Sequence, residues 1–414
     1  MIKIYKSKAL ILLIILMLTS FALSGCSLIG GNDGHSENAI LIGVFEPMSG
    51  EAESDAVDEI RGIELANELF PEVLGKPVEL EYQDNKSTIA GAETAAVNLA
   101  KAGASVSIGS YSSIYSIAAG SIFKEAKLPV ITATATNPLV TSGNEYYFRA
   151  CFTDTYQGTT MAKYAFENLG ARKALVIYNQ DDDFGATVGD IFASKLKDLL
   201  KLENKTTPQA VVTAAALQAE KPAVVTIRYT TEQEDISSLL STVNANDPDV
   251  IFLPASLEES KNIIAKIREI GFDGIFLGTT TWEDPSLISS LGEYAEGVVF
   301  PALYDQTVIY NDLGNKFVEA YQAKYGDSGE IPNSAALGFD AYLLAINAIY
   351  KAGTSVDGEA IRNALFETQE YYGVTGSITF MWSNDPVKSV VLRTVKDGAV
   401  VYCDTMMPTF REVN

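Results

Sequence analysis

Three turns of this chain carry small hydroxyl residues at the point where a predicted strand passes into a predicted helix. They are Pro47-Met48-Ser49-Gly50, Gly109-Ser110-Tyr111-Ser112-Ser113 and Thr132-Ala133-Thr134-Ala135-Thr136-Asn137-Pro138. Backbone N–H groups and the positive end of a helix dipole attract an anion at such a turn, and hydroxyls add hydrogen-bond donors. Each turn taken alone also fits an ordinary helix N-cap, which favours the same residue types. Three of them together predict a binding site for a small carboxylate.

Several kinds of catalytic site are excluded or disfavoured by the residues present. His35 is the only histidine, and it lies in a polar, Gly-rich stretch at 30–38 that is typical of a flexible tether. A tether cannot hold a histidine against a nucleophile, so Ser-His-Asp and Cys-His catalysis and His-ligated zinc are excluded. The phosphate-binding patterns Gly-x-x-x-x-Gly-Lys-Ser/Thr and Gly-x-Gly-x-x-Gly are absent, which disfavours a nucleotide. No cofactor is expected.

Two acidic features leave alternatives open. Asp181-Asp182-Asp183 resembles part of a calcium loop, but the glycine and glutamate that complete such a loop are missing, which favours a solvated strand-to-helix turn. Among the 53 Asp and Glu residues some pair must be adjacent by chance, so counting alone does not exclude a two-carboxylate hydrolase. Nothing in the sequence singles out such a pair.

The turns are positioned by an alternation of short β-rich and amphipathic helical segments from residue 39 onward, which predicts parallel sheets covered by helices. The predicted strands are 40–45, 78–82, 105–108, 129–132, 174–178, 224–227, 250–253 and 275–277. The predicted helices are 57–70, 89–102, 114–127, 155–169, 186–200, 236–243, 258–270, 313–324, 334–352 and 356–368. Residues 373–401 look like closing strands, and 203–222 like a surface insertion. The pattern restarts near residue 146, which indicates two α/β units.

The N-terminus has the pattern of an export signal. Lys3, Lys6 and Lys8 precede an apolar run at 9–18, and the run leads into Leu23-Ser24-Gly25-Cys26. The last four residues resemble a bacterial lipobox, in which the signal is cut before the cysteine and the thiol receives lipid. The alternatives are a plain signal peptide or an N-terminal anchor helix. We expect 1–25 to be a signal peptide, Cys26 to be the lipidation site and 26–38 to be a tether.

Composition limits the partners. The 389 residues after the signal exceed one usual core, so two domains are expected. The net charge is −23, and loss of the three leader lysines would leave −26. Such a surface repels phosphate backbones and anionic lipid headgroups, so nucleic acid is not an expected partner, and membrane attachment should depend on acyl chains. Cys151 and Cys403 could pair in an oxidising compartment, although two free thiols are the simpler interpretation.

The order and spacing of motifs from Ile40 to Tyr402 resembles the type I periplasmic binding proteins of the leucine-isoleucine-valine-binding family, the extracytoplasmic receptors of ABC importers. The resemblance rests on Ile42-Gly43-Val44, Pro47-Met48-Ser49-Gly50, Gly62, Asp84, Ser112-Ser113, Phe148-Arg149, Asp154, Phe184-Gly185, Pro248-Asp249-Val250, Ala295-Glu296-Gly297, Phe339-Asp340-Ala341 and Gly373-Val374-Thr375-Gly376. It implies two Rossmann-like lobes of flavodoxin-like strand order, joined by three hinge crossings. Lobe 1 would contain 39–149 and 304–372, and lobe 2 would contain 150–303 and 373–414.

Ligand-binding residues follow from the resemblance, position by position. Ser113, with Ser112 as the near alternative, and the turn of Thr134, Ala135 and Thr136 would hold a ligand carboxylate. From the second lobe, Asp154 matches an acidic position that can contact a ligand ammonium. Its alternative role is that of a helix N-cap.

Other matched positions depart from the family pattern. Phe184 replaces the tyrosine that covers the ligand, and Thr280 lies in a run of threonines where amino-acid binders often carry an acid. Asp55 stands where an aromatic residue is common. Trp282 either stacks on the ligand, which is the preferred interpretation, or fills an interlobe wall. An amino acid is therefore one plausible ligand among small carboxylates.

The expected function is that of a lipid-anchored, monomeric receptor that closes on a small solute and hands it to an ABC permease, without catalysis. One alternative is a sensory receptor of the same fold that signals to a membrane partner. The other is an extracellular carboxylate-based hydrolase.

Overall fold

The computed structural model describes residues 35–36, 38–206, 223–230, 237–326, 329–380 and 383–408. The predicted signal peptide, Cys26 and most of the predicted insertion at 203–222 lie outside these residues. Residues from Ile40 onward form one compact unit. Within the described part, every helix is too short or too polar to cross a membrane.

The first sheet is mostly parallel. Its strand order is β2 (Glu72–Val73), β3 (Lys76–Asp84), β1 (Ile40–Glu46), β4 (Val106–Gly109), β5 (Val130–Thr132) and β6 (Tyr147–Arg149). Strands β3 to β6 pair in parallel, while the short β2 is antiparallel to β3. Counted along the chain, the parallel strands have the order 2-1-3-4-5. This result confirms the predicted flavodoxin-like order.

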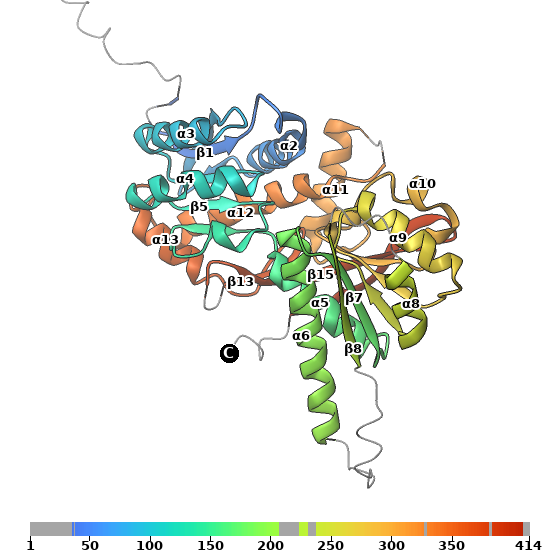
Figure 1. The fold of residues 1–414 in the computed structure, drawn as a ribbon. Helices are drawn as coiled ribbons and strands as arrows, with labels where there is room; N and C mark the ends of the chain where they lie inside the picture. Colours follow the sequence, from blue (N-terminus) through green and yellow to red (C-terminus); the bar gives the residue numbers. More distant parts are fainter. Residues whose placement is uncertain are drawn as a thin grey trace, which may run out of the picture. The chain divides into compact units, whose positions relative to one another are not determined.

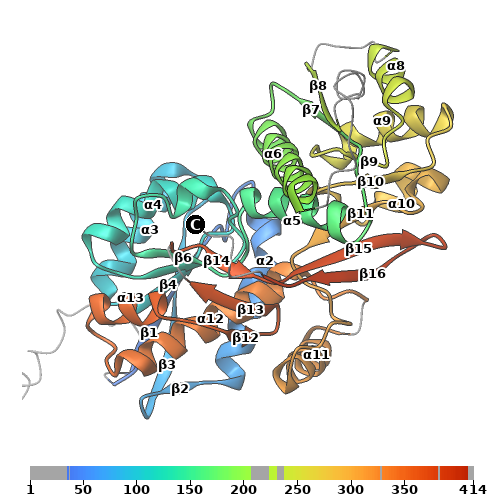
Figure 2. The same ribbon diagram turned by 90° about the horizontal axis from the view of Figure 1, so that it is seen from below.

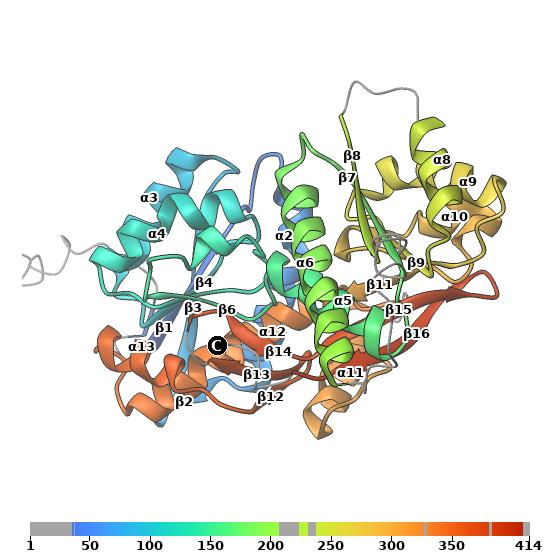
Figure 3. The same cartoon turned by 60° about the horizontal axis from the view of Figure 1, so that its bottom comes forward.

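Helices cover both faces of this sheet (Figure 3). One face packs against α3 (Ile89–Ala102) and α4 (Ser113–Glu125). The other packs against α2 (Glu53–Leu69), α11 (Asp312–Tyr325), α12 (Asn333–Ala352) and α13 (Gly358–Phe366). Helices α2 and α12 approach closely, since a Cβ at Gly62 would lie 1.9 Å from the carbonyl oxygen of Ala335 and one at Gly338 would lie 2.4 Å from that of Glu59. Glycine is therefore required where these helices cross.

The second sheet repeats the same parallel order and adds an antiparallel hairpin. Its order is β16 (Ala399–Met406), β15 (Val390–Lys396), β11 (Val299–Ala302), β10 (Ile275–Leu277), β9 (Val250–Phe252), β7 (Ala174–Asn179) and β8 (Val224–Tyr229). Helices α5 (Asp154–Glu167) and α6 (Asp183–Thr206) cover one face, and α8 (Ser237–Asn246), α9 (Leu257–Glu269) and α10 (Leu287–Leu291) cover the other (Figures 1 and 2). The rings of Phe192 and Phe252 stack between α6 and the sheet, with centroids 4.2 Å apart.

One predicted boundary needs correction. Strands β12 (Tyr371–Gly373), β13 (Gly376–Phe380) and β14 (Pro386–Lys388) form a small third sheet. Val374, Ile378 and Phe380 are buried in the same core as α2 and α12, so this sheet belongs to the first lobe. The last crossing between the lobes is therefore at 388–390, not at the predicted 372–373. The other two crossings are at 149–153 and 302–304.

Candidate functional site

The predicted carboxylate turns lie together at the carboxyl ends of β1, β4 and β5. In the first sheet the strand order reverses between β1 and β4, and open α/β sheets bind their ligands at this kind of switch point. The register brings Phe45 opposite Gly109, so the turn after β1 and the turn after β4 start side by side. The N-terminus of α4 opens from the second of these turns.

Ser113 and Thr134 connect the β4–α4 turn to the turn after β5. Ser113 Oγ accepts a hydrogen bond from the backbone N–H of Asn137 at 3.4 Å. Thr134 Oγ1 lies 2.6 Å from Glu59 Oε2 and 3.2 Å from the carbonyl oxygen of Tyr111, and both are acceptors. Ser112 occupies the N-cap of α4 but makes no side-chain cap bond. The hydroxyls of Ser112 and Ser113 are thus not used as caps.

Arg149, at the end of β6, fixes the turn after β5 by hydrogen bonds to its backbone carbonyls. Its guanidinium donates to the carbonyl oxygens of Ala135 at 2.6 Å and Asn137 at 3.0 Å, and to Thr141 Oγ1 at 3.0 Å. It also pairs with Asp385 at 2.5 Å, and its side chain is fully buried. Ala135 is therefore positioned through its carbonyl by Arg149. Arg149 was expected only as part of a family motif, although a basic residue at the end of an apolar strand is a usable signal for a buried guanidinium.

Asp154 reaches the same turn from the first hinge crossing. Its backbone N–H donates to the carbonyl oxygen of Thr136 at 3.3 Å, and its carboxylate accepts from Gln157 Nε2 at 3.3 Å. Burial raises the pKa of Asp154, against hydrogen bonds from Thr136 and Gln157 and the charge of Arg149, which lower it. The N-cap of α5 is Thr153, whose hydroxyl accepts from Tyr156 N–H. The cap interpretation of Asp154 is therefore wrong, and its carboxylate is available for another role.

Thr280 and Phe184 are two predicted site residues of the second lobe, and a hydrogen bond connects only Thr280 of the two to the residues described above. The N–H of Thr280, at the start of a 3₁₀ turn after β10, donates to Gln157 Oε1 at 3.2 Å, which connects it to Asp154 through Gln157. Phe184 lies in the first turn of α6, where Asp182 accepts from the N–H groups of Phe184 and Gly185 at 3.1 and 3.0 Å. Asp182 is thus a helix cap. Its contacts agree with the strand-to-helix interpretation of the three aspartates.

Trp282 is placed differently from the preferred interpretation. Its side chain is fully buried in the second-lobe core, where its indole N–H lies 3.1 Å from both the Ala255 carbonyl and Ser260 Oγ. The ring lies over Gly278, where a Cβ would come within 2.2 Å of it. This packing favours the wall-filling alternative over stacking on a ligand, and the ligand-side role of Trp282 stays a prediction.

Asp55 lies on the exposed first turn of α2. Burial, followed by the charges of Asp55, Glu59, Glu46 and Asp58, raises the pKa of Tyr111 to about 12. The side of the site formed by Tyr111 is therefore strongly acidic. Such surroundings favour a ligand that carries a positive group beside its carboxylate.

The structure also brings together two glutamates that the sequence analysis did not select. Glu46 ends β1 and Glu59 lies in α2, and both are fully buried. Glu59 recurs at helical spacing with the buried Ala56 and Ile63, which was the signal for an inward-facing carboxyl. Glu46 accepts a hydrogen bond from Tyr111 N–H at 2.7 Å. The pair thus lies directly behind the hydroxyl turns.

Both cysteines of the described part are free. Cys151 is buried in the first crossing with Sγ 3.5 Å from the Ala135 carbonyl, and burial raises the pKa of its thiol to about 12. Cys403 lies 3.3 Å from the Tyr164 hydroxyl. The simpler interpretation of two free thiols matches this arrangement.

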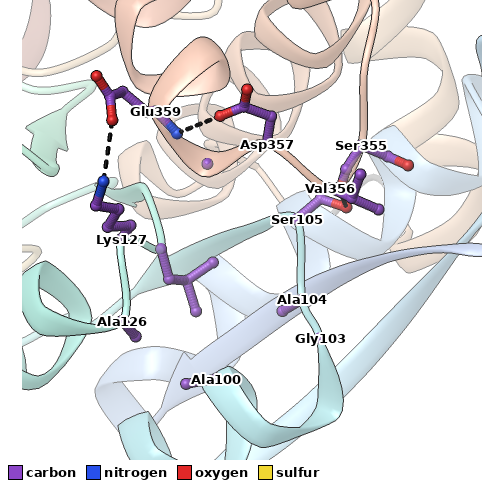
Figure 4. A pocket seen from close by; sticks show the side chains of 12 residues that line it. Ala100, Gly103, Ala104, Ser105, Ala126, Lys127, Ser355, Val356, Asp357 and Glu359 are labelled. Atoms are coloured by element: carbon purple, nitrogen blue, oxygen red, sulfur yellow. Dashed lines mark hydrogen bonds and ion pairs between the residues drawn. The ribbon is translucent and has the colours of Figure 1, made fainter.

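A cavity of about 530 Å³ lies at the opposite end of the first sheet (Figure 4). Ser105 and Leu128, which precede β4 and β5, line it together with residues 355–359. Lys127 Nζ and Glu359 Oε2 form an exposed ion pair across one edge at 3.0 Å. The switch-point turns contribute nothing to this cavity, so it is separate from the candidate site.

Comparisons with known proteins match most of the chain. The profile of the family described as "Receptor family ligand binding region" matches residues 70–396. The Leu/Ile/Val-binding protein homolog 3 of Brucella melitensis is 22% identical over 356 residues, covering 84% of this chain and 88% of the relative. The leucine binding protein LivK of Thermotoga maritima is 32% identical, with a TM-score of 0.69 and coverage of 89% of this chain and 99% of that one. LivJ of Streptococcus pneumoniae, solved with isoleucine, is 24% identical over 89% of this chain and all of its own, with a TM-score of 0.65.

Proposed function

Since the chain belongs to the receptor ligand-binding family that includes the Leu/Ile/Val-binding proteins, we propose that it is an extracytoplasmic, lipid-anchored receptor that binds an amino acid and delivers it to an ABC importer. The observation that carries the proposal is the convergence of the Ser113 turn, the Thr134–Thr136 turn and Asp154 at the first switch point. The proposal requires no catalytic step.

The site has complementary groups for a zwitterion. The hydroxyls of Ser113 and Thr136 and the N-terminus of α4 suit a carboxylate. Asp154 suits an ammonium, and a bound cation would lower its raised pKa. Arg149 is engaged by Asp385, two carbonyls and Thr141, so hydroxyl and backbone donors are left to bind the carboxylate. This division of roles fits an α-amino acid better than a simple carboxylate.

Hinge closure would supply the transport signal. The three crossings join the lobes close to Asp154, and Tyr156 of α5 donates to the carbonyl oxygen of Lys388 at the third crossing at 2.9 Å. A ligand that contacts both lobes stabilises the closed state over the open one, which a permease can recognise. The Cys26 sequence supports tethering at a membrane, where a permease would be available.

A thermal-shift screen of residues 39–414 tests the proposal directly. The panel contains the twenty L-amino acids, benzoate, putrescine, glucose and adenine. An amino acid at 100 times its dissociation constant should add about 2.7 kcal/mol to the free energy of unfolding. Stabilisation by glucose or adenine alone, with every amino acid inert, would refute the proposed ligand class.

Substitution of Thr136 by alanine is expected to weaken amino-acid binding about tenfold or more. A hydrogen bond to a charged group contributes about 1.5–3 kcal/mol, and each 1.4 kcal/mol is tenfold in affinity. Isothermal titration with the best amino acid of the screen measures the loss. Thr94→Ala on the exposed side of α3 is the matched control, with unchanged affinity expected. Equal affinities of the two variants would remove Thr136 from the site.

A further inference from the structure

Two buried carboxyl groups each hold one of the two ligand turns. Glu46 Oε2 accepts from the N–H of Tyr111 at 2.7 Å, in the turn that leads to Ser113. Glu59 Oε2 lies 2.6 Å from Thr134 Oγ1, in the turn that leads to Thr136. Both side chains are completely shielded from solvent. Any bond between the two carboxyls would therefore connect the two turns.

One oxygen of each carboxyl is left over by the contacts to Tyr111 and Thr134. Among the described residues, Glu46 Oε1 and Glu59 Oε1 are both buried without a hydrogen-bond partner. Burial is the main cause that raises the pKa of Glu46, and the charge of Glu59 and a hydrogen bond to Glu59 raise it further, against hydrogen bonds from Tyr111 and Ser110. Burial also raises the pKa of Glu59, against its hydrogen bonds to Glu46, Thr134 and the Ala133 backbone N–H, which lower it. Two like charges in contact in a dry site cannot both persist, whereas one proton between them satisfies both orphan oxygens.

We propose that Glu46 and Glu59 share one proton between their Oε1 atoms, and that this bond clamps the Tyr111 turn to the Thr134 turn. Glu46 is then a positioning residue for the ligand site, although it does not touch the ligand. The proposed clamp is inferred from the contacts of the two carboxyls alone. Its predicted effect on ligand binding depends in addition on the proposed function.

The surroundings favour retention of the proton. The backbone of Gly109 closes over Glu46, since a Cβ there would lie 2.4 Å from Oε1 and 2.1 Å from the Phe45 carbonyl. The Tyr147 hydroxyl donates to the Gly109 carbonyl at 2.7 Å and remains neutral. The other titratable groups around the pair are Tyr111 with the acids Asp55 and Asp58 beside it, and Cys151, on which Arg149 and Lys388 act.

The clamp makes stability depend on pH in a defined direction. Because the pKa of the pair is raised on folding, the folded state keeps a proton that the unfolded chain releases near the ordinary glutamate pKa. The free energy of unfolding therefore falls as the pH rises from the ordinary glutamate pKa of the unfolded chain through the raised pKa of the folded pair. Once the proton is lost, repulsion between the two carboxylates should separate the turns and weaken the hydrogen bond that the Tyr111 N–H donates to Glu46.

Glu46→Gln is the decisive variant because it imitates the protonated state permanently. Its amide oxygen can accept from Tyr111 N–H, and its NH₂ can donate to Glu59 Oε1. Glu59→Gln does the same from the other side, so either variant serves if the other does not fold. In the double variant Tyr111 and Thr134 engage the two amide oxygens, so the two NH₂ groups face each other with no acceptor between them. Glu53→Gln, on the exposed first turn of the same helix, is the charge-matched control.

The experiment follows the urea midpoint, the protection factor of the Tyr111 amide (its exchange rate relative to the intrinsic rate at each pH) and the affinity for L-leucine from about pH 5 to about pH 9. In the wild type and Glu53→Gln, we expect all three to weaken with rising pH. Affinity should fall by up to about tenfold per pH unit once the shared proton is lost, since one proton is linked to binding. In either single Gln variant this dependence should disappear, while Glu46→Ala should weaken affinity throughout and the double variant should be less stable than both single ones.

The outcomes separate the clamp from the proposed function. Parallel pH profiles in the wild type and the single Gln variants would overturn the clamp, as would a double variant as stable as the single ones. If L-leucine binds to none of the proteins, the urea and exchange profiles still decide on the shared proton, and the missing affinity counts only against L-leucine as the ligand.

Discussion

Replacing Arg149 with methionine should lower the free energy of unfolding by about 3–5 kcal/mol, because it removes a fully buried guanidinium that pairs with the partly exposed Asp385 and donates to three further buried or partly buried acceptors. The carbonyl oxygens of Ala135 and Asn137 would lose their donor, and Asp385 would lose its cation. Methionine has a similar length and keeps the apolar contacts, so the loss should report the polar contacts. Urea unfolding at constant pH measures it.

The control for this prediction is Arg228→Met in the second sheet. Arg228 is 52% exposed and lies 3.3 Å from Asp190, which is 58% exposed. Exposed ion pairs contribute about 0–1 kcal/mol, so the control should remain within that range of the wild type. If both variants lost the same stability, Arg149 would not be the residue that holds the turn. Residual folded Arg149→Met protein should also bind amino acids poorly, since Thr136 follows directly on the released carbonyl.

Replacing Asp340 with alanine should cause a comparable loss, about 3–5 kcal/mol, where α12 meets the small third sheet. The buried carboxylate accepts from the N–H groups of Val374 and Thr375 at 2.7 and 2.9 Å and from the Thr375 hydroxyl at 2.5 Å. The same hydroxyl accepts from Lys388 Nζ at 2.5 Å. Burial lowers the pKa of Lys388 to about 8, while the charge of Asp340 raises it. Without Asp340 the lysine should lose its charge at neutral pH.

Asp357→Ala is the matched control for Asp340→Ala. Asp357 also accepts from two backbone N–H groups, those of Glu359 and Ala360 at 3.1 Å, but it does so at an exposed N-cap. Loss of such a cap costs about 1 kcal/mol. Asp340→Asn should restore part of the stability, because its amide oxygen can still accept. A loss no larger than that of Asp357→Ala would contradict the role assigned to the buried carboxylate.

Helices and strands were predictable from the sequence where their hydrophobic periodicity extends over many residues. Helix 89–102 matches α3 at both ends, because Thr88 and Gly103 mark its caps. Strands β6 and β11 were missed, since three or four buried residues carry no period that separates them from a loop. Helix α6 begins three residues before the predicted start, because Asp182 caps it.

The site was predictable as residue types but not as contacts. The motifs that contain Asp340 and Gly373 were both recognised, yet only the fold shows why they occur together. A Cβ at Gly373 would lie 2.3 Å from the Asp340 carboxylate. Glu46 and Glu59 lie in different elements, so no local spacing relates them. Trp282 shows the converse, because its position after a strand does not reveal which way the ring turns.

The interleaved lobes have a consequence for how the chain folds. The first core needs α12 and the small third sheet, and the second sheet needs the β15–β16 hairpin that follows them. A nascent chain therefore cannot complete either core until nearly all of it has been synthesised, and its long-range pairings slow folding further. A chain that stays unfolded for that long can still be threaded through a membrane channel in extended form. For a receptor proposed to act outside the cytoplasm, late folding is thus an advantage, and it follows from the order of the strands along the chain.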